Sequence, residues 1–197
     1  MSKVKVIRNL VGEEICMLLA TELRVAKAIS DMTEKLGDNP LPKTHTVPYP
    51  IGVESLLLLL NQRVNEEWGK NLLPAYAMGR ILYTGSELKP HRDRRSSEYA
   101  MTLCLEKDCN YPIYFDGEEF ELEPGDAVLY KGSEVMHWRE KYEGKEHLQC
   151  FLFYVDAEGE FKELKYDTRP FVGLSEEHKD MEKVAKYCDA TARRMNK

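Results

Sequence analysis

The chain has 197 residues and a net charge of −6, with 34 acidic and 28 basic side chains. This length suits one globular domain with a sizeable core, and the acidic balance argues against a general electrostatic grip on nucleic acid. The leucine run at 56–60 is far too short to span a membrane. The basic N-terminus lacks the apolar segment of a secretory signal. We therefore expect a cytoplasmic protein that binds neither membrane nor nucleic acid.

The five cysteines indicate a reducing compartment. Their number is odd and no two form a CxxC pair. Most lie in apolar periodic segments, so we expect reduced, mostly buried thiols rather than disulfides or a cysteine-bound zinc ion. They are Cys16, Cys104, Cys109, Cys150 and Cys188.

The first third of the chain predicts helices. Residues 3–8 alternate like a short strand, and one apolar stripe predicts a helix over 12–35. Four prolines and two glycines within 37–52 predict a loop. A second helix is expected over 53–68, with the leucine run as its buried face. These helices belong to an N-terminal part within residues 10–70.

From residue 75 onward the pattern predicts strands. Short segments rich in aromatic and β-branched residues alternate with glycine-containing turns, as in an antiparallel sandwich or barrel. We expect this β core over 75–156 and a C-terminal helix over 175–195, capped by Ser175, in a single domain over 1–197. The predicted strands are 75–83, 99–105, 111–115, 118–123, 126–131 and 148–155.

A cluster of polar residues stands next to one of these core strands. In an extended strand, residues two apart point the same way, so His91 and Asp93 can aim a ring nitrogen and a carboxylate at one point. A metal site needs a third ligand, and both His137 and His147 flank the last strands. His137 follows a Pro-Gly-Asp turn, a strand and a second turn, which on a sandwich places it across from the His91 strand.

Two histidines and one carboxylate leave three coordination positions open. This is the ligand set of non-haem Fe(II) oxygenases, although zinc would fit the same residue types. A cupin-like metal-binding jelly-roll, acting as an isomerase or sensor without oxygenase activity, is the alternative. Cupins usually carry a paired His-x-His and a glutamate, so the His-x-Asp pair favours the oxygenase. A halogenase is disfavoured because Asp93 fills the position that a halide would need.

Several segments together resemble the Fe(II)/2-oxoglutarate-dependent dioxygenase superfamily, on its prolyl 4-hydroxylase-like branch. They are HRD at 91–93 with EPGDAVLYKGSEVMHW at 123–138, KVIRNLVGEEICMLLATEL at 5–23 and RILYTGSELKPHRD at 80–93. The resemblance covers most of residues 3–156. It implies a mainly β fold with flanking helices: a double-stranded β-helix, or jelly-roll, core with helices packed on one side.

The resemblance also implies a reaction and its cofactors. His91, Asp93 and His137 match the metal-binding and catalytic triad, with Fe(II), 2-oxoglutarate and O2 as the reaction partners and ascorbate as a compatible further cofactor. Hydroxylation of a small molecule or a peptidyl side chain would release succinate and CO2. The primary substrate is not specified by these motifs. The terminal helices are compatible with a homodimer interface or with a lid.

The expected binding residues for 2-oxoglutarate depart from the family pattern. Relatives carry Arg or Lys on the strand after the distal histidine, where this chain has His147, with Gln149 two residues later. Neutral histidine is a poorer carboxylate partner than a guanidinium group. Arg139 is an alternative because it would share a strand face with His137, and Tyr83 matches a tyrosine that contacts the co-substrate in relatives.

For the substrate, we expect Arg94 to hold an anionic group at the mouth of the barrel, with Glu98 beside it. Arg80 could do likewise, or could pair with a carboxylate. Lys145, another candidate for the co-substrate, is more typical of a solvated loop.

Overall fold

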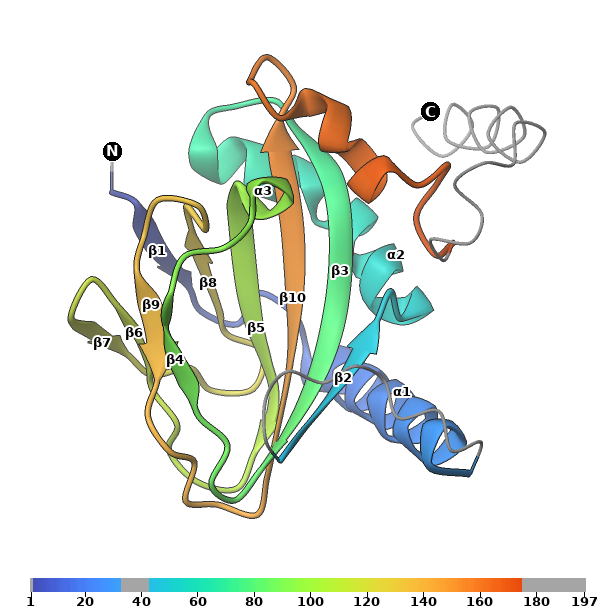
Figure 1. Cartoon of the computed structure of the whole chain (residues 1–197), viewed down its shortest axis with the longest axis vertical. Helices are drawn as coiled ribbons and strands as arrows, with labels where there is room; N and C mark the ends of the chain where they lie inside the picture. The colour runs from blue at the N-terminus through green and yellow to red at the C-terminus, as the bar shows by residue number, and fades with distance from the viewer. Residues whose placement is uncertain (1, 33–42, 175–197) are drawn as a thin grey trace.

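The computed structural model describes residues 2–32 and 43–174, which form two antiparallel sheets with helices on one side (Figure 1). The larger sheet has the order β1-β8-β5-β10-β3-β2 and the smaller one β4-β9-β6-β7. The larger sheet consists of β1 (Val4–Ile7), β8 (Ala127–Tyr130), β5 (Tyr99–Lys107), β10 (Glu146–Asp156), β3 (Leu72–Tyr83) and β2 (Thr44–Pro48). The smaller consists of β4 (Leu88–His91), β9 (His137–Arg139), β6 (Ile113–Phe115) and β7 (Glu118–Phe120).

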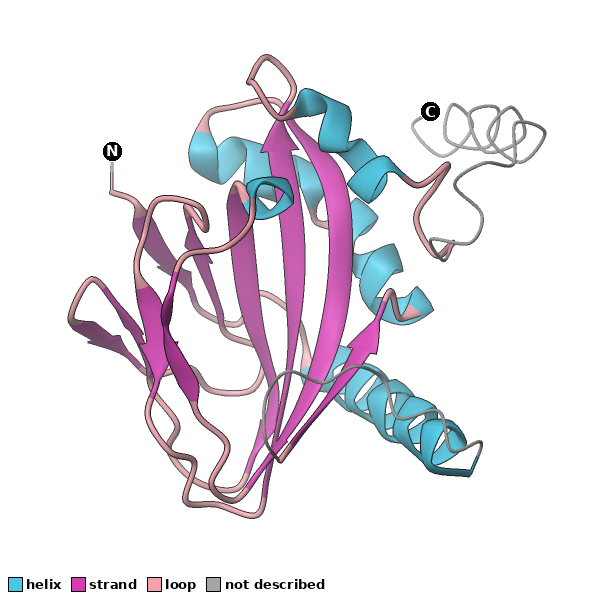
Figure 2. Ribbon diagram, in the orientation of Figure 1, coloured by secondary structure: helices cyan, strands magenta, loops and turns pink. Residues whose placement is uncertain are grey.

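The helices cover one face of the larger sheet (Figure 2). They are α1 (Glu13–Met32), α2 (Ile51–Leu59) and α3 (Asn61–Trp68). The short 3-10 segments η1 (Arg95–Ser97) and η2 (Lys162–Thr168) lie against β3 and β10, where β10 ends and β3 begins. One apolar cluster joins the helices to this face, and a second fills the space between the two sheets. The expected jelly-roll with helices on one side is therefore confirmed.

Strand β10 shows why the sequence folds into these layers. Leu148, Cys150 and Leu152 join the cluster under the helices, whereas Phe151 and Phe153 join the cluster between the sheets. Successive side chains in a strand point to opposite faces, and both faces of this central strand are covered. An almost continuous apolar run is what a strand buried on both faces requires.

Two predictions for the N-terminal part are corrected. The expected loop over 37–52 contains the edge strand β2, since its prolines flank or end the strand and leave the pairing groups of Thr44 to Val47 free to bond with β3. The single helix expected over 53–68 is two helices, divided at Leu60, where φ is −86° and ψ is −4°.

The expected C-terminal helix over 175–195 lies outside the described residues, so the single domain over 1–197 stays a prediction. Within the described ranges, Cys16, Cys104 and Cys150 are buried free thiols and Cys109 is partly exposed. Burial raises the pKa of Cys104 to about 12, so this thiol stays protonated at neutral pH. In this part of the chain, none of the helices is both long and apolar enough to cross a bilayer.

The Pro-Gly-Asp turn before β8 is held by its aspartate. The buried Asp126 carboxylate accepts hydrogen bonds from the backbone N–H of Asn9 at 2.9 Å and of Glu123 at 3.0 Å. It also forms an ion pair with Arg8 at 2.6 Å. Burial opposes ionisation of Asp126, but these partners outweigh it and lower the pKa below its usual 3.8. The turn thereby ties the chain after β1 to the start of β8.

We expect Asp126→Asn to lower the free energy of unfolding by about 1–3 kcal/mol at pH 7, because charge-assisted hydrogen bonds are lost. A depressed carboxyl pKa stabilises the fold above the unfolded-state value of about 4 and ceases to do so as the pH falls through the folded-state value. The difference in free energy of unfolding between the two proteins, measured by urea unfolding, should therefore become smaller below about pH 4. Asp31→Asn, at an exposed helix position, is the control, and a difference independent of pH would contradict this role.

Candidate metal centre

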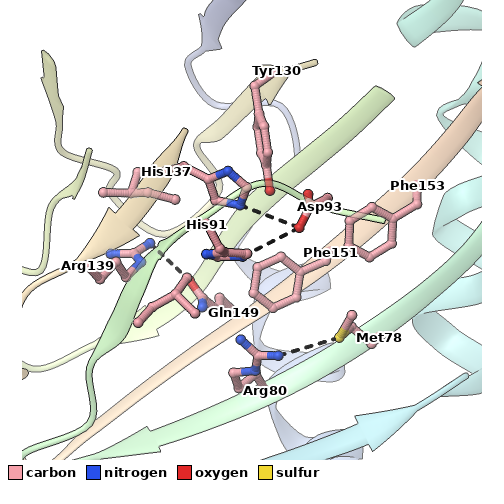
Figure 3. A pocket seen from close by; sticks show the side chains of 12 residues that line it. Met78, Arg80, His91, Asp93, Tyr130, His137, Arg139, Gln149, Phe151 and Phe153 are labelled. Atoms are coloured by element: carbon pink, nitrogen blue, oxygen red, sulfur yellow. Dashed lines mark hydrogen bonds and ion pairs between the residues drawn. The ribbon is translucent and has the colours of Figure 1, made fainter. Parts of the chain in front are cut away.

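The centre lies where β4 and β9 pair. His91 and His137 are direct cross-strand partners, and Asp93 follows two residues after the end of β4. The nearer Asp93 oxygen is 3.6 Å from His91 Nε2 and 3.5 Å from His137 Nε2, and the three donor atoms all lie within 4.8 Å of one another. Figure 3 shows both rings turned toward this carboxylate.

The backbone orients both imidazole rings. His91 Nδ1 lies 2.9 Å from the carbonyl oxygen of Lys89, and His137 Nδ1 lies 3.0 Å from that of Val135. A carbonyl can only accept, so each Nδ1 carries the hydrogen. This leaves each Nε2 with a lone pair pointing at the centre, the tautomer that metal-binding histidines use.

The carboxylate is positioned by a close backbone approach. The backbone N–H of Asp93 donates to the carbonyl of Gly132 at 2.8 Å. A Cβ atom on Gly132 would lie 2.6 Å from Asp93 Oδ2 and would also collide with the carbonyl oxygen of Ser97. Only glycine therefore fits beside the carboxylate. Asp93 Oδ2 itself is buried and has no hydrogen-bond partner in the described part of the chain.

The electrostatics keep the aspartate ionised. Burial opposes its charge, but its interactions with His137 and His91 lower the pKa of Asp93 to about 2. The same contact with Asp93 raises the pKa of His91. A metal ion must displace any proton on His91, so metal affinity should decrease as the pH falls.

These residues fit a divalent metal ion. Ligands bound at about 2.0–2.2 Å lie roughly 3.0–3.5 Å apart from one another, close to the His–Asp separations observed. An unpartnered buried carboxylate oxygen is the kind of atom that a cation would satisfy. Two imidazoles and one carboxylate suit iron as well as zinc. His91, Asp93 and His137 would hold the ion.

A cavity of about 220 Å³ extends from the three ligands between the two sheets. Apart from the ligands, its walls are mostly apolar and aromatic, with three polar side chains from both sheets. The lining residues are Met78, Arg80, Leu88, His91, Asp93, Ile113, Tyr130, His137, Arg139, Gln149, Phe151 and Phe153.

Arg139 is a buried cation in this wall. It is 2% exposed, and its guanidinium donates to the backbone carbonyl of Tyr111 and, at 2.9 Å, to the side-chain oxygen of Gln149. Among the described residues, no carboxylate pairs with it, and its buried Nε has no partner. Burial lowers the pKa of Arg139 to about 10, so it is still charged at neutral pH. A buried unpaired cation is costly unless an anion binds there.

Of the other residues expected to bind 2-oxoglutarate, one lines the cavity and the others lie outside it. Gln149 lies in the cavity, where it orients Arg139. His147 is buried behind Gln149, 3.3 Å from its oxygen, and burial lowers the pKa of His147 to about 3, so this ring is neutral. Tyr83 packs with the cluster under the helices, on the opposite face of β3, and does not line the cavity. Lys145 is exposed.

The two residues expected at the substrate have partners within the protein. Arg94 donates to Asp167 at 2.7 Å and its guanidinium carbon lies 4.4 Å from the centre of the Tyr76 ring. Arg94 lines a neighbouring cavity rather than the one at the ligands. The Glu98 carboxylate accepts from the backbone N–H of Asp156 at 2.9 Å, so it secures the end of β10.

Most residues of the cavity wall were not predicted from the sequence. Phe151 and Phe153 follow Gln149 at spacings of two and four, so strand alternation could have placed all three on one face. Tyr130 ends the strand that the Pro-Gly-Asp turn starts, and in Figure 3 its hydroxyl points toward Asp93. Arg80 was expected from the sequence either to hold an anionic group or to pair with a carboxylate, and the structure places it in the cavity wall.

Comparison with known proteins supports the fold. No family model and no curated protein matches the sequence. A prolyl-4-hydroxylase from Pseudomonas putida has a similar structure, with a TM-score of 0.59, 18% identity, and coverage of 78% of this chain and 92% of that chain. The viral collagen prolyl hydroxylase of Paramecium bursaria Chlorella virus-1, in complex with 2-oxoglutarate, is also similar. It has a TM-score of 0.60 and 9% identity, and the match covers 78% of this chain and 95% of that chain.

A third similar structure is HygX from Streptomyces hygroscopicus with nickel and 2-oxoglutarate bound. It has a TM-score of 0.57 and 13% identity, and the match covers 80% of this chain and 84% of that chain. At such identities the likeness concerns the fold. The chain therefore has the fold of the prolyl 4-hydroxylase-like Fe(II)/2-oxoglutarate oxygenases, as the sequence resemblance implied.

We expect Asp93→Ala to weaken divalent metal binding by at least about 100-fold while the fold survives, because the carboxylate is a ligand at the edge of the core. Titration with Fe(II) without oxygen, together with a thermal unfolding curve, measures both properties. Asp31→Ala removes an exposed carboxylate of α1 and serves as the control. Wild-type metal affinity in the Asp93→Ala protein would rule out this ligand set.

Proposed function

We propose that this protein is an Fe(II)- and 2-oxoglutarate-dependent oxygenase that hydroxylates a small molecule or a peptidyl side chain. Substrate, O2 and 2-oxoglutarate are converted to hydroxylated substrate, succinate and CO2. The observation that carries the proposal is the group of two histidines and one aspartate beside a cavity with a buried, unpaired arginine. The ligands suit the metal, and the arginine suits the far carboxylate of a 2-oxo acid.

Iron bound to His91, Asp93 and His137 supplies the binding and activation of O2. The protein supplies the ligands, their orientation and a cavity from which aromatic side chains exclude bulk water. Exclusion of water strengthens the electrostatic interactions of Arg139 with a bound anion. Gln149 and the carbonyl of Tyr111 occupy two sides of this guanidinium and so hold it in one orientation.

We assign the C5 carboxylate of 2-oxoglutarate to Arg139. Relatives place the cation on the strand after the distal histidine, where this chain has the neutral His147. Arg139 reaches the cavity from β9 instead, and a carboxylate there would satisfy its buried, unpartnered Nε–H group. Charge-assisted hydrogen bonds between guanidinium and carboxylate are among the strongest in proteins. Tyr83 is not assigned to 2-oxoglutarate, because it does not line the cavity.

The structural neighbours support both substrate classes. Two of them are prolyl hydroxylases, and HygX has also been crystallised with hygromycin B, a further match at 13% identity. A cytoplasmic location, a role for ascorbate and a homodimer stay predictions.

We expect the Fe(II) protein, titrated with 2-oxoglutarate under anaerobic conditions, to develop a metal-to-ligand charge-transfer band. Such a band requires chelation of the iron by the 2-oxo acid. Replacing Arg139 by Gln should weaken 2-oxoglutarate binding about 10- to 100-fold, which corresponds to a loss of about 1.5–3 kcal/mol for a charged hydrogen bond. Arg139→Lys, which keeps the charge, should retain part of the affinity.

Tyr83→Phe is the matched control for the same titration, because the structure places its ring on the other face of β3. His147→Ala separates the two candidate carboxylate partners. A loss of affinity in His147→Ala with none in Arg139→Gln would reverse the assignment. If the iron protein showed no band at any 2-oxoglutarate concentration, the cupin-like reading would replace the oxygenase.

A further inference from the structure

A second guanidinium group lines the same cavity. Arg80 comes from β3, on the sheet opposite to Arg139, and its guanidinium carbon lies 5.0 Å from the centre of the Phe151 ring. Its one hydrogen-bonding contact in the described structure is a weak one, from Nη2 to the sulfur of Met78 at 3.8 Å. Within the described residues no carboxylate pairs with Arg80, and its Nε is buried without a partner. The positive charge of this arginine is therefore unpaired within the described residues, and its Nε–H donor is unused.

A threonine on the neighbouring strand also has a buried polar group without a hydrogen-bond partner in the described chain. Thr46 of β2 is the direct cross-strand partner of Arg80, and Gln149 of β10 is the partner on the other side. These three side chains form a row across the inner face of the larger sheet, since directly opposite residues point the same way. The hydroxyl of Thr46 is also buried with no hydrogen-bond partner in the described chain. Two adjacent unsatisfied groups on one row indicate a missing ligand.

The row stands between two cavities. Thr46 lines a second cavity, also of about 220 Å³, whose walls include Tyr49, Tyr76 and Arg94. Met78 lines both this cavity and the one at the metal ligands. Arg80 belongs to the metal cavity and Thr46 to the second, so the pair lies at their junction. Arg139 and Gln149 do not reach the second cavity.

The charges of the metal cavity leave room for one more anion. Its lining residues include Arg80 and Arg139 but only one carboxylate, Asp93. With a divalent ion bound, these groups have an excess of three positive charges. A 2-oxoglutarate dianion neutralises two of them. One positive charge remains, in a wall where burial disfavours an unpaired cation.

We propose that Arg80 and Thr46 bind an anionic group, a carboxylate or a phosphate, of the primary substrate. This inference rests on the proposed function and narrows its substrate class to acidic molecules. The substrate occupies the second cavity and extends past Met78 to the metal. Arg80 is assigned to the substrate rather than to 2-oxoglutarate because it adjoins the second cavity, which Arg139 does not. Arg94, already paired with Asp167, lies elsewhere in the second cavity's wall.

The test uses fluoroacetate as a carboxylate probe, observed by fluorine NMR on the protein loaded with Zn(II) and saturating 2-oxoglutarate. We expect wild-type protein to broaden the probe signal in a saturable way and Arg80→Gln to bind it roughly tenfold more weakly, as expected for loss of a charged partner. Arg80→Lys should bind with intermediate affinity. Arg63→Gln, which removes the same charge from the surface of α3, should match wild type.

Thr46→Val provides a second variant that leaves the arginine in place and replaces the hydroxyl by a methyl group. It should weaken the probe about threefold or more, as expected for loss of one hydrogen bond. If fluoroacetate bound Arg80→Gln and Thr46→Val as tightly as wild type, the proposed anion site would be wrong.

Calorimetric titration with 2-oxoglutarate distinguishes the two proposals. Arg80→Gln should retain 2-oxoglutarate affinity within about threefold, whereas a tenfold loss would assign Arg80 to the co-substrate and overturn this inference. That outcome would leave the oxygenase proposal intact. Failure of the wild-type metal protein to bind 2-oxoglutarate would overturn the proposed function, and this inference with it.

Discussion

The pairing of β4 with β9 is the constraint on which the centre depends. This short pairing places His91 directly opposite His137, and the backbone carbonyls of Lys89 and Val135 then orient the two rings. The strands are too short to be stable alone. They are held because the apolar cluster between the sheets packs the smaller sheet against the larger one. The three candidate metal ligands are thus positioned by the packing of the two sheets.

The larger sheet contributes charge rather than ligands. Its central strands β3 and β10 bring Arg80 and Gln149 to the inner face, next to Phe151 and Phe153. The opposite face is covered by α1, α2 and α3. The cavity lies on the uncovered face, toward the smaller sheet, and shares Met78 with the second cavity. Buried guanidinium groups in such a place stabilise bound anions at the expense of the stability of the empty protein.

In the proposed assignment, Arg139 takes the role that a cation on the following strand has in relatives. His147 has the position along the chain at which relatives carry a cation, but its ring is buried and neutral. Arg139 enters the cavity from β9 of the smaller sheet and is oriented by Gln149 of the larger sheet. What the co-substrate requires is a positive charge at one point in space, and more than one strand position can reach that point.

Much of the fold and the ligand set could be predicted from the sequence, because they depend on local patterns. The alternation of short strands and turns indicated an antiparallel sandwich or barrel, and the spacing of His91 and Asp93 with the Pro-Gly-Asp turn before His137 indicated a metal site. The jelly-roll was implied by the resemblance to the oxygenase superfamily. The edge strand β2 was missed because its prolines resemble those of a loop. Tertiary structure alone decided which cations face the cavity. Whether the side chain of Tyr83, Arg80 or Arg139 lies toward the cavity depends on strand register and on which sheet lies opposite. Neither is encoded within a few neighbouring residues.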